Sequence, residues 1–286
     1  MNATGTIVAA FGRHYEIELD DGRVVTGYPR GKKSPYACGD EVELNADGQI
    51  LAHRPRRSLL YRSDAYRQKL IAANVTQLIL VVATEPGFSD LLLSRALVAA
   101  EHQSLDVLIV LNKIDRSDKL ADARRQLQPF VALGYRVVEL AALQNVAALT
   151  PHLDAQTSVL VGQSGMGKST IINGLFPHAA AHTREISLAL DSGKHTTTYA
   201  RLYRLAPHSA LIDSPGLQEF GLNHLSIEEI EFGFVEFRPH QGNCRFRNCR
   251  HQSEPDCAIK SAVAAGTIHP RRMEHYRQLL KESGQA

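Results

Sequence analysis

One segment of the chain combines the residue types that hold the phosphates of a nucleotide. Residues 162–169 read Gly-Gln-Ser-Gly-Met-Gly-Lys-Ser. The glycines let backbone N–H groups converge on phosphate oxygens, Lys168 adds a cation, and the Ser169 hydroxyl can ligate Mg²⁺. Residues 159–161 predict a strand before this segment and residues 169–175 predict a helix after it, which is the setting that a phosphate loop requires. The predicted phosphate-binding residues are Gly162, Gln163, Ser164, Gly165, Met166, Gly167, Lys168, Ser169 and Thr170.

A second segment could select the base. Asn112, Lys113, Ile114 and Asp115 follow the apolar residues 107–111, so they should emerge at the same sheet edge as the phosphate loop. The Asp115 carboxylate can accept two hydrogen bonds from the imino and amino groups of guanine, whereas adenine offers no matching pair of donors. Alone, this tetrapeptide could be any polar turn. Together with the phosphate loop it favours GTP over ATP, with Asn112, Lys113 and Asp115 as the base-side residues.

Two further segments are predicted to bind Mg²⁺ and the terminal phosphate. Any threonine of residues 196–198 could ligate the ion beside Ser169, and Thr197 is the predicted ligand. Asp213 ends an apolar stretch and would bind the ion through its water shell, while the Gly216 N–H would reach the γ-phosphate. The predicted catalytic residues are Lys168, Thr197, Asp213 and Gly216.

The group that orients the attacking water is not evident. Many GTPases have a glutamine directly after the glycine of this last segment, but Leu217 stands here and its aliphatic side chain cannot orient water. Intrinsic hydrolysis should therefore be slow, and a partner that completes the site could accelerate it by ~10³ to 10⁵. His195 is a second candidate, although a lone loop histidine is more often a surface residue.

The order of these segments is unusual. An ordinary GTPase has its phosphate loop first and its base-reading segment later, whereas residues 112–115 here precede residues 162–169 and residues 213–216 come last. We interpret this as a circular permutation, which preserves the pocket but changes how neighbouring units are attached. Residues 213–216 now lead almost directly into the C-terminal region.

Three cysteines and one histidine form a candidate metal site. Cys244, Cys249, His251 and Cys257 supply three thiolates and an imidazole within one short stretch, which predicts one tetrahedral, structural zinc ion. Reduced free thiols are the alternative. Cys38 is isolated and is predicted to be inert.

The chain of 286 residues is predicted to form three units: residues 1–60, 61–225 and 226–286. Short alternating segments in the first unit favour an all-β barrel of the oligonucleotide-binding type, although a generic small barrel fits as well. Strands at residues 78–82, 107–111, 137–140 and 159–161 predict a doubly wound α/β domain with a parallel sheet in the second. The third is a small zinc-binding domain with a final helix that packs Met273, Tyr276 and Leu280 against the core.

Basic residues gather on both sides of the central unit, although the formal net charge is only +2. The basic residues of 54–69 could grip a phosphate backbone or could be a solvated linker. Residues 238–286 contain nine Lys or Arg against four Asp or Glu, and Phe246 lies between two arginines. This composition suits RNA, and a solvated face is the alternative. We expect a monomer. We also expect a cytoplasmic protein without membrane contact, because the apolar stretches are shorter than the ~20 residues that span a bilayer and residues 1–19 lack a signal-peptide pattern.

The chain resembles the ribosome small subunit-dependent GTPase A family of bacteria over nearly its whole length. The resemblance rests on the four nucleotide segments, on Glu236-Phe237-Arg238-Pro239 and on the candidate zinc ligands. It implies an N-terminal oligonucleotide-binding barrel, a permuted GTPase centre and a C-terminal zinc domain that act in late assembly of the 30S subunit. Partners would be the 30S subunit, its 16S rRNA and GTP or GDP, with Mg²⁺ and Zn²⁺ as cofactors. One departure is Ala141-Ala142, where the family usually has Ser-Ala before a guanine contact.

We predict that GTP holds the two flanking units in an RNA-binding clamp and that hydrolysis releases them. The alternative from another class is an RNA-binding module in which GTP is a ligand without significant turnover, which the leucine at position 217 keeps open. A weaker alternative is an ATPase.

Overall fold

The computed structural model describes residues 2–31, 35–63, 68–177, 199–214 and 221–284. Two sheets run through these residues, one of eleven strands and one of two. Among the described helices, none is both long and apolar enough to cross a membrane. The strands are β1 (Ala3–Ala10), β2 (Tyr15–Leu19), β3 (Val24–Gly27), β4 (Glu41–Leu44), β5 (Ile50–His53), β6 (Leu59–Ser63), β7 (Gln68–Ala73), β8 (Gln77–Ala83), β9 (Asp106–Asn112), β10 (Arg136–Glu139), β11 (Thr157–Val161), β12 (Ala200–Ala206) and β13 (Ser209–Asp213).

The central part of the large sheet is parallel. Its strands follow the order β10-β9-β8-β11-β13, and each neighbouring pair is parallel. Every residue of β8 is buried, as expected for a strand covered on both faces. The four strands predicted at residues 78–82, 107–111, 137–140 and 159–161 are confirmed as β8, β9, β10 and β11.

The sheet as a whole is mixed, which the prediction of a parallel sheet did not include. The short turn between β12 and β13 allows only an antiparallel pair, and β12 then pairs with β1 through Ala9 with Arg201 and Ala10 with Ala200. Two ion pairs reinforce this seam, Arg201 with Glu16 and Arg204 with Glu18, each with N···O of 2.7 Å. The N-terminal strands are therefore continuous with the central sheet.

The first five strands pair in the order β3-β2-β1-β4-β5. A parallel bridge between Tyr28 and Gln49 then links the end of β3 to the start of β5, with backbone N···O distances of 3.0 and 2.9 Å. Alternate side chains of these strands fill a separate apolar core. Its buried members are Ile7, Tyr15, Ile17, Leu19, Val42, Leu44 and Ile50.

The described residues at the end of the basic stretch 54–69 include parts of two strands. β6 and β7 pair in the antiparallel direction, and the Leu59 N–H donates to Gln103 Oε1 at 3.0 Å. Arg56 is also committed, because its guanidinium donates twice to the buried carboxylate of Asp40, each at 2.7 Å. Arg56 is therefore part of the folded structure, and the two alternatives for the other basic residues of this stretch stay open.

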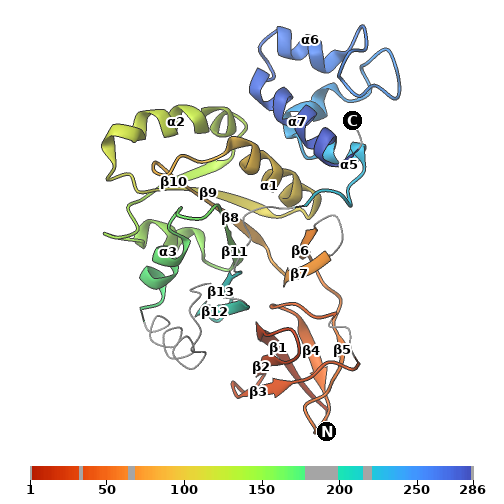
Figure 1. Cartoon of the computed structure of the whole chain (residues 1–286). Coiled ribbons are helices and arrows are strands. Elements are labelled where there is room, and N and C mark those ends of the chain that lie inside the picture. Colours follow the sequence, from red (N-terminus) through yellow and green to blue (C-terminus); the bar gives the residue numbers. More distant parts are fainter. Residues whose placement is uncertain (1, 32–34, 64–67, 178–198, 215–220, 285–286) are drawn as a thin grey trace.

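The helices are α1 (Asp90–His102), α2 (Ser117–Ala132), α3 (Lys168–Leu175), α5 (Ile227–Phe232), α6 (Ala258–Ala264) and α7 (Pro270–Glu282), with the 3-10 helices η1 (Ala147–His152) and η2 (Val235–His240). In Figure 1 the C-terminal helices, in blue, gather beside α1, while the N-terminal strands, in red, lie at the opposite end of the molecule. Met273, Tyr276 and Leu280 of α7 are buried, which confirms the predicted core face of the final helix.

A buried ion pair lies within the C-terminal region, and its arginine also binds α1. The side chains of Arg272 and Glu236 are 1% and 4% exposed, and Arg272 Nε donates to Glu236 Oε1 at 2.6 Å. Arg272 Nη1 donates to Ser94 Oγ of α1 at 2.6 Å, and the guanidinium lies over the Phe234 ring at 4.4 Å. Neither charge can be solvated by water, so each depends on the other.

Glu236→Ala should lower the free energy of unfolding by ~3–5 kcal/mol, because it leaves the Arg272 charge buried without its partner. The double variant Glu236→Leu/Arg272→Met should recover most of this loss, since it removes both charges. Urea unfolding followed by fluorescence and circular dichroism measures both. The control is Arg124→Ala, which breaks a more exposed pair with Glu139 and should change the free energy of unfolding far less, because water screens that pair. Equal losses for the two single variants would contradict the prediction.

Candidate nucleotide site and metal centre

The side chain of Asn112 joins three segments that are far apart in the sequence. Asn112 is 1% exposed at the end of β9, and its Nδ2 donates to the Met166 carbonyl oxygen at 2.9 Å. Its Oδ1 accepts from the backbone N–H groups of Lys113 at 2.8 Å and Ala142 at 3.0 Å. The predicted base-reading segment, the phosphate loop and the Ala141-Ala142 segment are thereby held against one another.

The phosphate loop lies between β11 and the first turn of α3. Gly167 precedes the helix with φ of +94°, and a Cβ on this residue would lie 2.2 Å from Asn112 Nδ2. Glycine is therefore required here both for the left-handed backbone and for the contact with Asn112. Lys168 Nζ donates to the carbonyl oxygens of Gly162 at 2.6 Å and Gln163 at 2.9 Å. The ammonium thus lies folded over the loop that should receive the phosphates.

Two opposite charges are desolvated at this edge. Burial lowers the pKa of the Lys168 ammonium, and the nearby Asp213 carboxylate opposes that shift. Burial raises the pKa of Asp213, and Lys168 opposes that shift in turn. Asp213 ends β13, the neighbour of β11 in the sheet. A divalent cation bound here would stabilise the carboxylate in its charged form.

The predicted base-reading segment is supported by a loop that no sequence motif had singled out. Thr84 Oγ1 donates to the Lys113 carbonyl oxygen at 2.7 Å, and Lys113 Nζ donates to the Glu85 carbonyl oxygen at 2.7 Å. Lys113 itself has φ of +61°, a left-handed conformation that these contacts maintain. Asp115 is exposed, as a residue that receives a ligand would be.

The described residues place most of the predicted nucleotide site along one sheet edge. Asn112 ends β9 and Lys113 follows it, residues 162–170 follow β11, and Asp213 ends β13. Thr197 and Gly216 lie outside the described residues, as do Leu217 and His195. The roles assigned to individual residues in nucleotide binding remain predictions.

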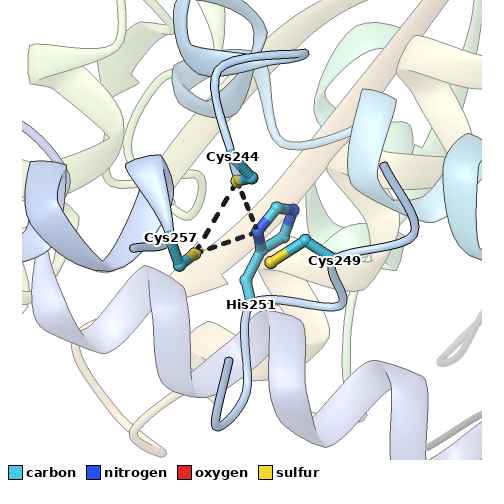
Figure 2. A group of neighbouring side chains, drawn as sticks. All are labelled: Cys244, Cys249, His251 and Cys257. Carbon is cyan, nitrogen blue, oxygen red and sulfur yellow. Dashed lines mark hydrogen bonds between the residues drawn. The ribbon is translucent and has the colours of Figure 1, made fainter. Parts of the chain in front are cut away.

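The four predicted metal ligands come together, as Figure 2 shows. One ligand atom from each of Cys244, Cys249, His251 and Cys257 lies within 4.8 Å of all the others. His251 Nδ1 is 3.2 Å from Cys257 Sγ and 3.6 Å from Cys244 Sγ, and these two sulfurs are 3.9 Å apart. Three soft sulfurs and one imidazole nitrogen around one point match the donor set that zinc prefers.

Glu231 of α5 is a further part of this centre that the sequence did not reveal. His251 Nε2 lies 3.1 Å from Glu231 Oε2, which turns the ring so that Nδ1 faces the sulfurs. Such a carboxylate fixes the tautomer and the orientation of a metal-binding histidine. Burial by itself raises the pKa of the Cys257 thiol, but the backbone N–H of Lys260 and the ring of His251 lower it, and the net shift is downward. Cys257 is thereby suited to act as a thiolate.

A phosphate loop between a parallel strand and a helix, with a polar segment locked beside it, defines a nucleotide-binding protein of the P-loop class. Residues 53–223 match the family described as RsgA GTPase. The chain belongs to this family, and it is a GTPase with a circularly permuted fold and a mixed sheet.

Relatives resemble the chain over nearly its full length. It is 54% identical to the small ribosomal subunit biogenesis GTPase RsgA of Paraburkholderia phytofirmans, with 98% of this chain and 93% of the relative covered. It is 52% identical to the protein of the same name from Nitrosospira multiformis, with 96% and 90% covered. The crystal structure of YjeQ from Thermotoga maritima superposes with a TM-score of 0.77 at 28% identity over 100% of both chains. YloQ, described as a circularly permuted GTPase, superposes with a TM-score of 0.73 at 26% identity, covering 99% and 96%.

Gly167→Ala should weaken binding of a fluorescent GDP analogue by at least ~10-fold, because the added Cβ would push Asn112 away from the phosphate loop. The left-handed backbone adds a strain of ~1–2 kcal/mol. Gly22→Ala is the matched control, since its φ is +84° and a Cβ there would meet no atom within 4 Å. Unchanged GDP affinity in Gly167→Ala would show that the contact between Asn112 and the loop does not shape the pocket.

Proposed function

We propose that this GTPase acts in the biogenesis of the small ribosomal subunit and that the 30S particle stimulates its slow intrinsic hydrolysis. The names of the relatives support the small ribosomal subunit as the partner. The observation that best supports nucleotide binding is the hydrogen bonding of the Asn112 side chain, which holds the base-reading segment against the phosphate loop. One nucleotide could therefore contact both segments.

The residues have separate roles in this proposal. Asp115 accepts hydrogen bonds from guanine, and the backbone N–H groups of residues 163–168 surround the phosphates. Lys168 leaves its two carbonyl partners and stabilises charge on the β- and γ-phosphates. Mg²⁺, held by Ser169, Thr197 and Asp213, would supply further charge neutralisation at the same oxygens. Gly216 donates its N–H to the γ-phosphate.

The flanking units are proposed to bind rRNA. For residues 1–60, the order β3-β2-β1-β4-β5 and the parallel bridge from Tyr28 to Gln49 favour a closed barrel of the oligonucleotide-binding type. For residues 226–286, the ligand cluster favours a zinc domain. Phe246 there is 42% exposed beside Arg245, a pairing that suits base stacking and phosphate contact. GTP would hold both units in one arrangement as a clamp, and the protein would act as a cytoplasmic monomer.

Phosphate release measured with purified 30S and 50S subunits separately tests this function. The 30S subunit should raise the rate toward the ~10³ to 10⁵ range seen when a partner completes a GTPase site, and the 50S subunit should not. Lys168→Ala should abolish the stimulated rate, which excludes a contaminating activity. If the 30S subunit bound the protein in a GTP-dependent manner without any stimulation, the RNA-binding module without turnover would be correct.

Glu231→Ala should weaken zinc binding by ~10- to 100-fold, because His251 loses the carboxylate that orients its ring. Competition with a chromophoric chelator measures the affinity. Glu228→Ala is the control, since this glutamate is exposed on the same helix. Equal affinity in both variants would mean that Glu231 does not support a metal ligand.

A further inference from the structure

The loop of residues 84–89 touches both halves of the proposed nucleotide site. Its first two residues contact Lys113 in the base-reading segment, as described above. On the other side, the backbone N–H of Ser89 donates to the side-chain Oε1 of Gln163 in the phosphate loop at 2.8 Å. A Cβ added to Gly165 would lie 3.4 Å from the Pro86 ring, so the two loops run close together at this point as well.

Gln163 completes the N-terminal cap of α1. Ser89 is the capping residue, and its hydroxyl accepts from the Leu92 N–H at 3.3 Å. In a capping box, the Glu or Gln at the third helical position accepts from the N–H of the capping residue in return. Leu92 occupies that position and cannot do so. Gln163, 74 residues away in sequence, provides the missing acceptor.

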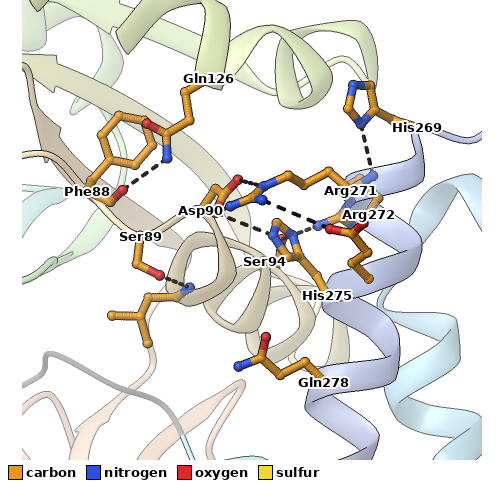
Figure 3. Close-up of polar contacts among 12 residues, drawn as sticks. Phe88, Ser89, Asp90, Ser94, Gln126, His269, Arg271, Arg272, His275 and Gln278 are labelled. Carbon is orange, nitrogen blue, oxygen red and sulfur yellow. Dashed lines mark hydrogen bonds and ion pairs between the residues drawn. The ribbon is translucent and has the colours of Figure 1, made fainter. Parts of the chain in front are cut away.

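Asp90, the first residue of α1, binds the C-terminal helix α7 (Figure 3). The Asp90 side chain is 8% exposed, and Arg271 of α7 donates to its two oxygens at 2.5 and 2.9 Å. His275 Nε2 lies 3.4 Å from Asp90 Oδ1, and its Nδ1 is 2.8 Å from Ser94 Oγ, one turn further along α1. The first turn of α1 therefore contacts the phosphate loop at one end and α7 on its side.

The Ser94, His275 and Asp90 side chains do not form a hydrolytic triad. Ser94 is fully buried, and its oxygen accepts from Arg272 Nη1. No substrate could reach this hydroxyl, so the cluster serves the contact between the two helices.

We infer that Gln163 is a positioning residue that transmits occupancy of the phosphate loop to α7 by fixing the first turn of α1. Its backbone carbonyl oxygen accepts from Lys168 Nζ, while its side chain accepts from Ser89. When Lys168 turns to the phosphates, the Gln163 peptide loses that donor and can reorient. The hydrogen bond from Ser89 to the Gln163 side chain then changes, and with it the position of the neighbouring Asp90. This inference rests on the proposed function in one respect, that Lys168 binds nucleotide phosphates.

Hydrogen exchange of the backbone amides of α7 tests the inference. Full-length protein is compared without nucleotide and with saturating GDP or a non-hydrolysable GTP analogue, each variant at its own saturating concentration. Nucleotide should change the exchange of residues 271–276 by at least about threefold in the natural chain. Gln163→Met, which keeps the side-chain length but lacks the acceptor, should lose this change. Gln163→Glu, which keeps an oxygen acceptor, should restore it.

A second variant and a control keep the test independent of folding defects in the phosphate loop. Arg271→Met breaks the contact at the other end and should also remove the change in α7. Gln278→Ala, on the same helix but bonded to Glu282, should preserve it. A change in α7 that persists in Gln163→Met, or nucleotide binding without any change in α7, would overturn the inference alone. Absence of nucleotide binding by the natural chain in a fluorescence titration would overturn the proposed function as well.

Discussion

The arrangement of the nucleotide site depends on one buried amide. Asn112 uses its Nδ2 and Oδ1 to bind Met166, Lys113 and Ala142. These residues belong to the base-reading segment, the phosphate loop and the Ala141-Ala142 segment, which are connected to one another only through long stretches of chain. A buried backbone group left without its partner costs ~1–3 kcal/mol, so the three segments are held at fixed distances. These hydrogen bonds depend on where the segments lie in the folded protein and do not depend on their order in the sequence. They explain how a permuted sequence can keep a pocket whose parts occur in an unusual succession.

Each flanking unit is joined to the nucleotide-binding sheet by a different type of contact. The N-terminal strands continue the sheet through β1 and β12, and β12 pairs in turn with β13, which ends at Asp213. The C-terminal helices contact α1 through side chains, among them Arg271 and Arg272. Backbone pairing is rigid, whereas side-chain ion pairs can exchange partners. The C-terminal contact is therefore the more adjustable of the two.

The sequence predicted those features that depend on local pattern. Continuous apolar runs identified β8 and β9, the glycine spacing identified the phosphate loop, and the ligand spacing identified the four clustered metal-site residues. The hairpin of β6 and β7 was missed because its basic residues obscure the alternation typical of a strand. The contacts of Glu231 with His251 and of Gln163 with Ser89 could not be predicted. They join segments that only the folded chain brings together, and neither glutamate nor glutamine has a local signature for such a role.

The shared core limits what nucleotide state can do to the C-terminal unit. Phe234, Phe237 and Tyr276 belong to the same apolar cluster as the central sheet, so complete release would expose this surface at a cost of about 25 cal/mol per Å². Coupling between two sites usually amounts to ~1–3 kcal/mol, which is the scale of a few polar contacts. Asp90 is buried but Arg271 is 55% exposed, so solvent screens their ion pair and weakens it. If nucleotide acts on α7 as proposed, α7 would re-orient against α1 about a retained apolar contact, and the proposed clamp would open by rotation without detachment.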